Sequence, residues 1–63
     1  MDRKHVKQQI QQYSVSELKE WRAHAVKCLN YYTKYRDDFE IEESQFVIDH
    51  IDERLKELKN RQD

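Results

Sequence analysis

The 63-residue sequence contains no glycine and no proline. Glycine provides the positive backbone angles of tight hairpins and phosphate-binding loops, and proline fixes the geometry of many turns. Their absence disfavours sheets built from hairpins and also glycine-rich nucleotide-binding loops. It predicts an all-α chain with short connections between its helices.

Cysteine and long apolar runs are also scarce. The single Cys28 cannot form an internal disulfide, so nothing indicates an oxidising compartment. No apolar stretch reaches the length of a membrane span or of a secretory signal. These absences predict a cytoplasmic protein that does not contact membranes and folds as one small helical domain over residues 1–63.

Charged side chains are abundant but unevenly distributed. Residues 1–36 carry eight Lys or Arg and three Asp or Glu, whereas residues 37–63 carry four and ten. The change falls at residues 36–38, where the hydrophobic pattern also shifts. This coincidence favours a turn between two helices of opposite charge that lie side by side, rather than a junction between domains.

The first long helix is predicted over about residues 14–37. Ser14 and Glu17 have the spacing of a capping box, and Tyr13 and Leu18 that of a hydrophobic staple. Apolar side chains then recur every three or four residues and form one stripe. The stripe consists of Leu18, Trp21, Ala25, Cys28, Tyr32, Tyr35 and Phe39, with Leu29 beside it.

The second long helix is predicted over about residues 39–60. Its stripe is two residues out of phase with the first, so one straight helix cannot place both stripes on one face. Asp37 and Asp38 are suitable helix caps, which places a turn near residues 37–40. A bent or continuous helix is the alternative, because neither Gly nor Pro forces a break. The second stripe consists of Ile41, Ser44, Ile48, Ile51, Leu55 and Leu58, with Val47 beside it.

Residues 1–13 are expected to be a loosely attached segment. Val6, Ile10 and Tyr13 have helical spacing, so a short helix from Arg3 to Gln12 forms if these side chains find a surface.

The helices over residues 14–37 and 39–60 predict an antiparallel helical hairpin. A hairpin alone leaves half of each stripe in water, so we expect a homodimer that forms a four-helix bundle. The stripe spacing also suits coiled-coil packing. The predicted self-association core comprises Leu18, Trp21, Ala25, Cys28, Leu29, Tyr32, Tyr35, Ile41, Ile48, Ile51, Leu55 and Leu58.

One pair of residues has the spacing of metal ligands. His24 and Cys28 lie one helical turn apart, and the predicted hairpin would bring Cys28 near Asp49 and His50. Zinc sites usually combine several Cys and His at tight spacings, which this sequence lacks. We therefore expect no metal and no other cofactor, with Cys28 as a small core residue.

Paired carboxylates are the other candidate for chemistry. Asp49, Glu53 and Glu57 share one helical face. General acid–base catalysis needs a cleft that perturbs the pKa values of such groups, and a hairpin of this size offers little concavity. A solvated acidic face is the simpler interpretation, so we expect no catalytic residues and no enzyme activity.

The aromatic side chains are the strongest functional indication. Phe46 falls on the side of its helix away from the apolar stripe, among acidic residues, so it should contact a basic and apolar surface. The N-terminal segment fits that description, either from the same chain or from a partner subunit. Tyr and Phe are favoured at protein–protein interfaces. The predicted partner-binding residues are Tyr31, Phe39, Phe46, Val6 and Ile10.

These features predict a small non-catalytic regulator or adaptor that binds itself and another protein. The alternative is a nucleic-acid-binding accessory factor that uses the basic face of residues 3–34, and a structural subunit of a larger assembly is a third possibility. A formal net charge of −1 and ten acids in the second half disfavour nucleic acid. The basic face consists of Arg3, Lys4, Lys7, Lys19, Lys27 and Lys34.

Overall fold

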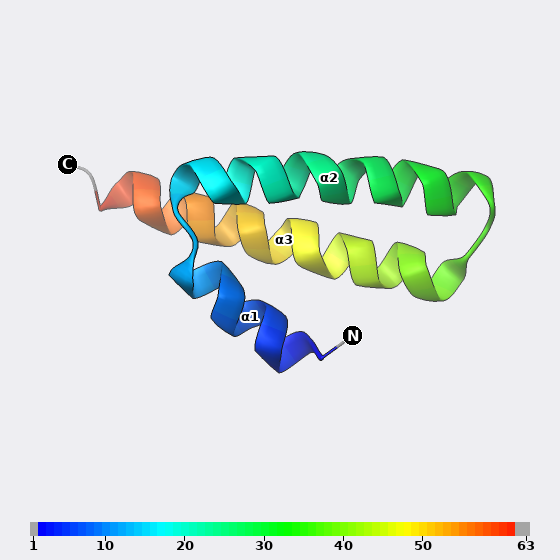
Figure 1. Ribbon diagram of the computed structural model, residues 1–63, viewed down its shortest axis with the longest axis horizontal. Coiled ribbons are helices and arrows are strands. Elements are labelled where there is room, and N and C mark those ends of the chain that lie inside the picture. The colour runs from blue at the N-terminus through cyan, green and yellow to red at the C-terminus, as the bar shows by residue number, and fades with distance from the viewer. Residues whose placement is uncertain (1, 62–63) are drawn as a thin grey trace.

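The computed structural model describes residues 2–61, and in this range it contains three α-helices and no β-strand. The helices are α1 (Arg3–Gln12), α2 (Val15–Lys34) and α3 (Asp38–Asn60). Figure 1 shows α2 and α3 running antiparallel, with α1 crossing beneath α3 near the end where α2 begins. The all-α fold and the antiparallel helical hairpin are therefore confirmed.

Local capping interactions explain where the first two helices begin. The Asp2 carboxylate accepts hydrogen bonds from the amides of Lys4 and His5, at 3.1 and 3.3 Å. The Ser14 hydroxyl accepts from the amide of Glu17, and the Glu17 carboxylate accepts from the amide of Ser14. The predicted capping box is thus present, and α1 has the predicted bounds.

The turn between α2 and α3 is formed without glycine. Arg36 has a φ of 56°, in the left-handed region that glycine usually occupies after a helix. The amide of Asp37 donates to the Tyr32 carbonyl at 3.0 Å, and that of Arg36 to the Thr33 carbonyl at 3.3 Å. These two bonds form a Schellman motif. The left-handed conformation costs a residue with a Cβ about 1–2 kcal/mol.

The position of this turn decides between the two arrangements considered for the hairpin. Because α2 ends at Lys34, it is shorter than predicted, and the chain is not one continuous or bent helix. The Asp37 carboxylate then accepts a hydrogen bond from the Glu40 amide at 3.2 Å and caps α3. The predicted capping role of Asp37 is therefore confirmed.

The core lies where all three helices meet. Its most completely buried large side chains are Ile10, Leu18 and Ile51, one from each helix. Val6 is also buried, so α1 contributes two core residues and is packed on the hairpin rather than loosely attached. The other buried apolar residues are Ala25, Val47 and Ile48.

Ion pairs link the basic first half of the chain to the acidic second half. Arg22 of α2 makes a two-point contact with the carboxylate of Asp52 on α3. The hydrogen bond and the negative charge of Asp52 raise the pKa of Arg22 above its usual value. Arg3 of α1 pairs with Glu42 and Glu43 of α3. The charge division seen in the sequence therefore serves contacts between helices within the chain.

None of the three helices, as far as the structure describes them, combines the length and the apolar character that a bilayer-spanning segment requires.

Candidate protein-binding surface

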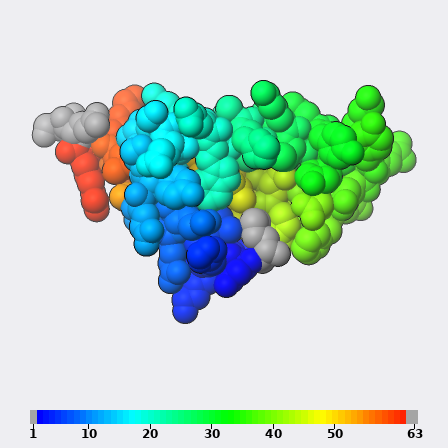
Figure 2. Space-filling view, viewed as in Figure 1, coloured from blue at the N-terminus to red at the C-terminus, as the bar shows by residue number. Residues whose placement is uncertain are grey.

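Three large aromatic side chains are exposed at the turn end of the hairpin. Tyr31 is 59 % exposed, Tyr35 62 % and Phe39 61 %. We call these three residues the aromatic end. Figure 2 shows α1 against one part of the hairpin, while the turn end extends beyond it. The aromatic end is therefore not covered by α1.

The two tyrosines of the aromatic end lie where α2 ends, with Tyr31 in its last turn and Tyr35 as the residue that caps it. Tyr31 and Tyr35 lie one helical turn apart, and their ring centroids are 4.7 Å apart. Tyr31 also makes an edge-to-face contact with Tyr32, at 5.4 Å and 85°. Such pairs favour a defined ring arrangement by about 0.5–1.5 kcal/mol. Tyr31 and Tyr35 thus form a preorganised aromatic pair, and Phe39 is a third exposed ring at the same end of the hairpin.

Two of the predicted partner-binding residues, Tyr31 and Phe39, belong to this exposed surface. Tyr35, which was assigned to a self-association core, lies beside them on the outside of the chain. The regular apolar spacing of the α2 stripe continues past the end of the helix, so Phe39 falls on α3 instead. Spacing alone could not distinguish Tyr35 and Phe39, which are exposed, from the buried residues of the same stripe.

The remaining partner-binding candidates are occupied within the chain. The Arg3 guanidinium lies 4.6 Å from the centre of the Phe46 ring, and the Lys7 ammonium 5.9 Å from it. Val6 and Ile10 are buried beside them in the core. The basic and apolar surface expected to contact Phe46 is α1 of the same chain, so Val6 and Ile10 offer no exposed surface to a partner in this arrangement.

A shallow groove between α2 and α3 adjoins the aromatic end. It has a volume of about 170 Å³. We call it the hairpin groove. Residues that line it include Trp21, Cys28 and Tyr32 of α2, and Glu40, Glu43 and Val47 of α3.

Two glutamates make this groove acidic. Glu43 is only 9 % exposed, and its Oε2 atom has no hydrogen-bond partner among residues 2–61. The charge of Glu40 is the main cause that raises the pKa of Tyr32 above its usual value. Sequence analysis assigned neither carboxylate to a site, although Glu40 lies three residues before Glu43 and Glu43 four residues before Val47, which places all three on one side of α3.

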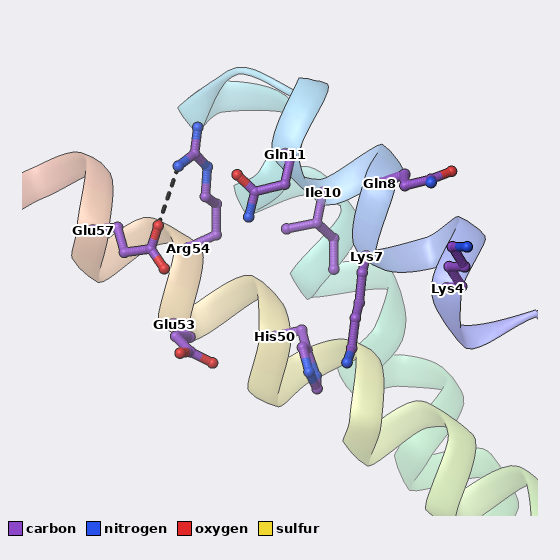
Figure 3. A pocket seen from close by; sticks show the side chains of 9 residues that line it. All are labelled: Lys4, Lys7, Gln8, Ile10, Gln11, His50, Glu53, Arg54 and Glu57. Carbon is purple, nitrogen blue, oxygen red and sulfur yellow. Dashed lines mark hydrogen bonds and ion pairs between the residues drawn. The ribbon is translucent and has the colours of Figure 1, made fainter.

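A second cleft, of about 510 Å³, lies between α1 and α3 (Figure 3). Lys4 and Lys7 of α1 and Glu53 and Glu57 of α3 are among the residues that line it, and Lys7 extends toward His50 (Figure 3). His50 also lines it and donates a hydrogen bond from Nδ1 to the Phe46 carbonyl at 2.9 Å. Side chains of both charges thus line an open surface between the two helices.

The third carboxylate of the acidic face is held elsewhere. The Asp49 carboxylate accepts a hydrogen bond from the side-chain amide of Gln45 at 2.8 Å. Glu57 pairs with Arg54 at 3.2 Å. Two carboxylates of the predicted acidic face are therefore bound to neighbouring side chains of α3, Asp49 to a neutral amide and Glu57 to a guanidinium.

The candidate metal ligands are only partly brought together. His24 Nε2 and Cys28 Sγ are 3.5 Å apart. The expectation that Cys28 lies near His50 is wrong: Cys28 lines the hairpin groove with Ser44, whereas His50 faces α1. Within residues 2–61, no group of three or more His, Cys, Asp or Glu side chains is placed to hold a metal ion.

Comparisons with protein-family models, with curated proteins and with solved structures find no match to this chain.

Proposed function

We propose that this chain is a small non-catalytic regulator or adaptor that acts by binding another protein through its aromatic end. The observation that carries the proposal is the exposure of about 60 % for each of Tyr31, Tyr35 and Phe39, although the chain has an apolar core elsewhere. Clustered exposed apolar side chains commonly mark interaction surfaces, and aromatic residues are enriched there.

Binding at these residues has a favourable energetic basis. Rings that already contact one another lose little side-chain freedom when a partner covers them. Burial of apolar area contributes roughly 25 cal/mol per Å², so three rings can supply a central hot spot. The proposed setting is the cytoplasm, where Cys28 would remain a reduced thiol.

Self-association is part of the same proposal. Val26, Leu29, Leu55 and Leu58 are only half-buried on the hairpin, so a second copy could cover them. Sedimentation at micromolar concentration tests this point, because a dimer has twice the mass of the 7.9 kDa chain. A helical monomer throughout the concentration series would exclude the homodimer and leave binding to other proteins as the proposal.

The aromatic end is tested by a triple variant, Tyr31→Ser, Tyr35→Ser and Phe39→Ser, used as bait in extracts of the native cell. We expect the variant to keep its far-UV circular dichroism and to lose the protein that wild type captures. The matched control replaces exposed polar residues of α2 (Lys19→Ser, Lys27→Ser and Asn30→Ser) and keeps the capture. Equal capture by wild type and the triple variant would contradict the proposal.

Nucleic-acid binding through the basic face of residues 3–34 is the competing proposal. Arg3, one of its cations, is already paired with Glu42 and Glu43. Binding to phosphates releases counterions, so the affinity should fall steeply with added salt. Retardation of DNA or RNA at low salt that disappears at high salt would favour this alternative over protein binding.

A further inference from the structure

The hairpin groove has the size of a site for one long side chain. Its volume of about 170 Å³ is close to that of a cavity of about 150 Å³, which holds a benzene molecule. Tyr32, which lines the groove, contacts Tyr31 of the aromatic end. A partner lying on the aromatic end can therefore extend a side chain into the groove.

The charges of the groove indicate which side chain it accepts. Glu43 is nine-tenths buried, and although its Oε1 atom is 3.5 Å from Arg3, its Oε2 atom is unpaired among the described residues. This oxygen is itself buried, so a donor in the groove reaches it when the Glu43 side chain shifts, and the cost of leaving it unsatisfied favours that contact. Glu40 lines the same groove and adds a second negative charge.

The groove also has aromatic walls. Trp21 and Tyr32 line it on the side of α2, opposite the two glutamates of α3. Lys and Arg rest their methylene groups on apolar surfaces, and their charged ends are attracted to aromatic faces. Carboxylates on one wall and rings on the other thus suit a cationic side chain with an apolar stem.

The chain already shows this form of recognition in the docking of α1. Arg3 lies over the Phe46 ring and contacts Glu42 and Glu43, while Val6 and Ile10 on the same helix enter the core. A basic amphipathic helix therefore binds the acidic and aromatic side of α3. Because Glu43 contacts Arg3 and also lines the groove, it can serve a second cation beside the first.

We propose that the hairpin groove binds a Lys or Arg side chain on an amphipathic helix of a partner protein. Glu40 and Glu43 accept its hydrogen bonds, and apolar residues of the partner helix cover Tyr31, Tyr35 and Phe39. This inference rests on the proposed function and names the chemistry of the partner. A second copy docked through the same face would bring the acids of one groove toward those of the other, which like-charge repulsion opposes.

The test is a selection of displayed 20-residue helical peptides on the full chain, followed by titration of the selected peptides as synthetic probes. Trp21 lines the groove and is the single tryptophan, so its fluorescence reports occupancy. We expect selected peptides to carry Lys or Arg beside large apolar residues. Replacing that cation with Gln should weaken binding about ten-fold or more.

Variants of the chain complete the test. Glu40→Gln with Glu43→Gln should lower the affinity about ten-fold or more. The matched control, Glu53→Gln with Glu57→Gln, removes the same amount of charge from the cleft between α1 and α3. It should bind the peptides with the affinity of wild type. If the first variant unfolds, the half-exposed Glu40→Gln alone supplies the measurement.

The outcomes separate this inference from the proposed function. Peptides that need Tyr31, Tyr35 and Phe39 but bind the glutamine variants as wild type would overturn the groove assignment and leave the protein-binding proposal standing. Selection of acidic peptides, or of none, would also overturn it. Dimerisation that is lost in Glu40→Gln with Glu43→Gln would mean that a second copy, rather than another protein, occupies the groove.

Discussion

The two ends of the hairpin differ in what covers them. Where α2 begins, α1 packs on α3 and buries Ile10 against the region of Leu18 and Ile51. At the turn, Tyr31, Tyr35 and Phe39 remain exposed over the part of the chain that the structure describes. One end therefore holds core side chains from all three helices, whereas the other leaves three aromatic rings in contact with solvent. Each prediction below tests that division.

The largest expected effect is the contrast between Ile10→Ala and Phe39→Ala. Ile10 is 2 % exposed, so its truncation leaves a cavity and should lower the free energy of unfolding by about 2–5 kcal/mol. Phe39→Ala should change it by less than about 0.5 kcal/mol, as is usual on a surface. Urea denaturation followed by circular dichroism measures both. Equal effects would show that the turn end also carries stability.

The next effect concerns the junction between α1 and α2. Ser14→Ala removes the hydroxyl that accepts from the Glu17 amide at 3.2 Å. We expect a loss of about 1 kcal/mol in the free energy of unfolding, typical of a missing helix cap. The control is Ser16→Ala, because Ser16 is an exposed serine in the first turn of α2 that does not cap the helix. A variant as stable as the control would indicate that packing alone holds the junction.

A gain is expected at the opposite end. Arg36→Gly should raise the free energy of unfolding by about 0.5–1 kcal/mol, because glycine adopts the left-handed conformation without steric cost but loses more entropy on folding. Arg36→Ala keeps a Cβ and should give no such gain. Thermal denaturation of the three proteins measures the difference. Similar midpoints for all three would show that the turn is not strained.

The smallest effect is a pH dependence at the covered end. Hydrogen bonds from the backbone and side chain of Ser14 hold the pKa of Glu17 below its usual value. A lowered folded-state pKa stabilises the fold above the unfolded-state pKa of about 4.3, and this contribution disappears as the pH falls through the folded-state value. Wild type should exceed Glu17→Gln in melting temperature at about pH 6 and lose that advantage near pH 3. A difference independent of pH would exclude this linkage.

Sequence reasoning identified the helices because their signals are local. The capping box at Ser14, the cap at Asp37 and the phase shift between the stripes depend on neighbouring residues only. The predicted end of the first long helix was too late. The apolar spacing continues through Tyr35, although the helical backbone ends at Lys34. No glycine marked the turn, and Arg36 replaced it at an energetic cost.

Contacts distant in the sequence could not be predicted in the same way. The spacing of Val6 and Ile10 required a surface but could not specify whether the same chain or a partner provided it. Likewise, Arg3 of α1 contacts Glu43 of α3, and no local sequence pattern predicts that contact. The exposed positions of Tyr31 and Phe39 agree with the candidate surface, and their role remains a prediction.

The sequence separation of the α1 contacts predicts an order of events in folding. The turn at residues 35–37 joins α2 to α3 through a short connection, and hairpins rich in such local contacts form in microseconds to milliseconds. Contact between Arg3 and Glu43 must instead close a loop of 40 residues. We therefore expect α1 to join an already formed hairpin and to detach first during native-state fluctuations. Amide hydrogen exchange should then be fastest in α1, and each opening would briefly expose Phe46 to solvent.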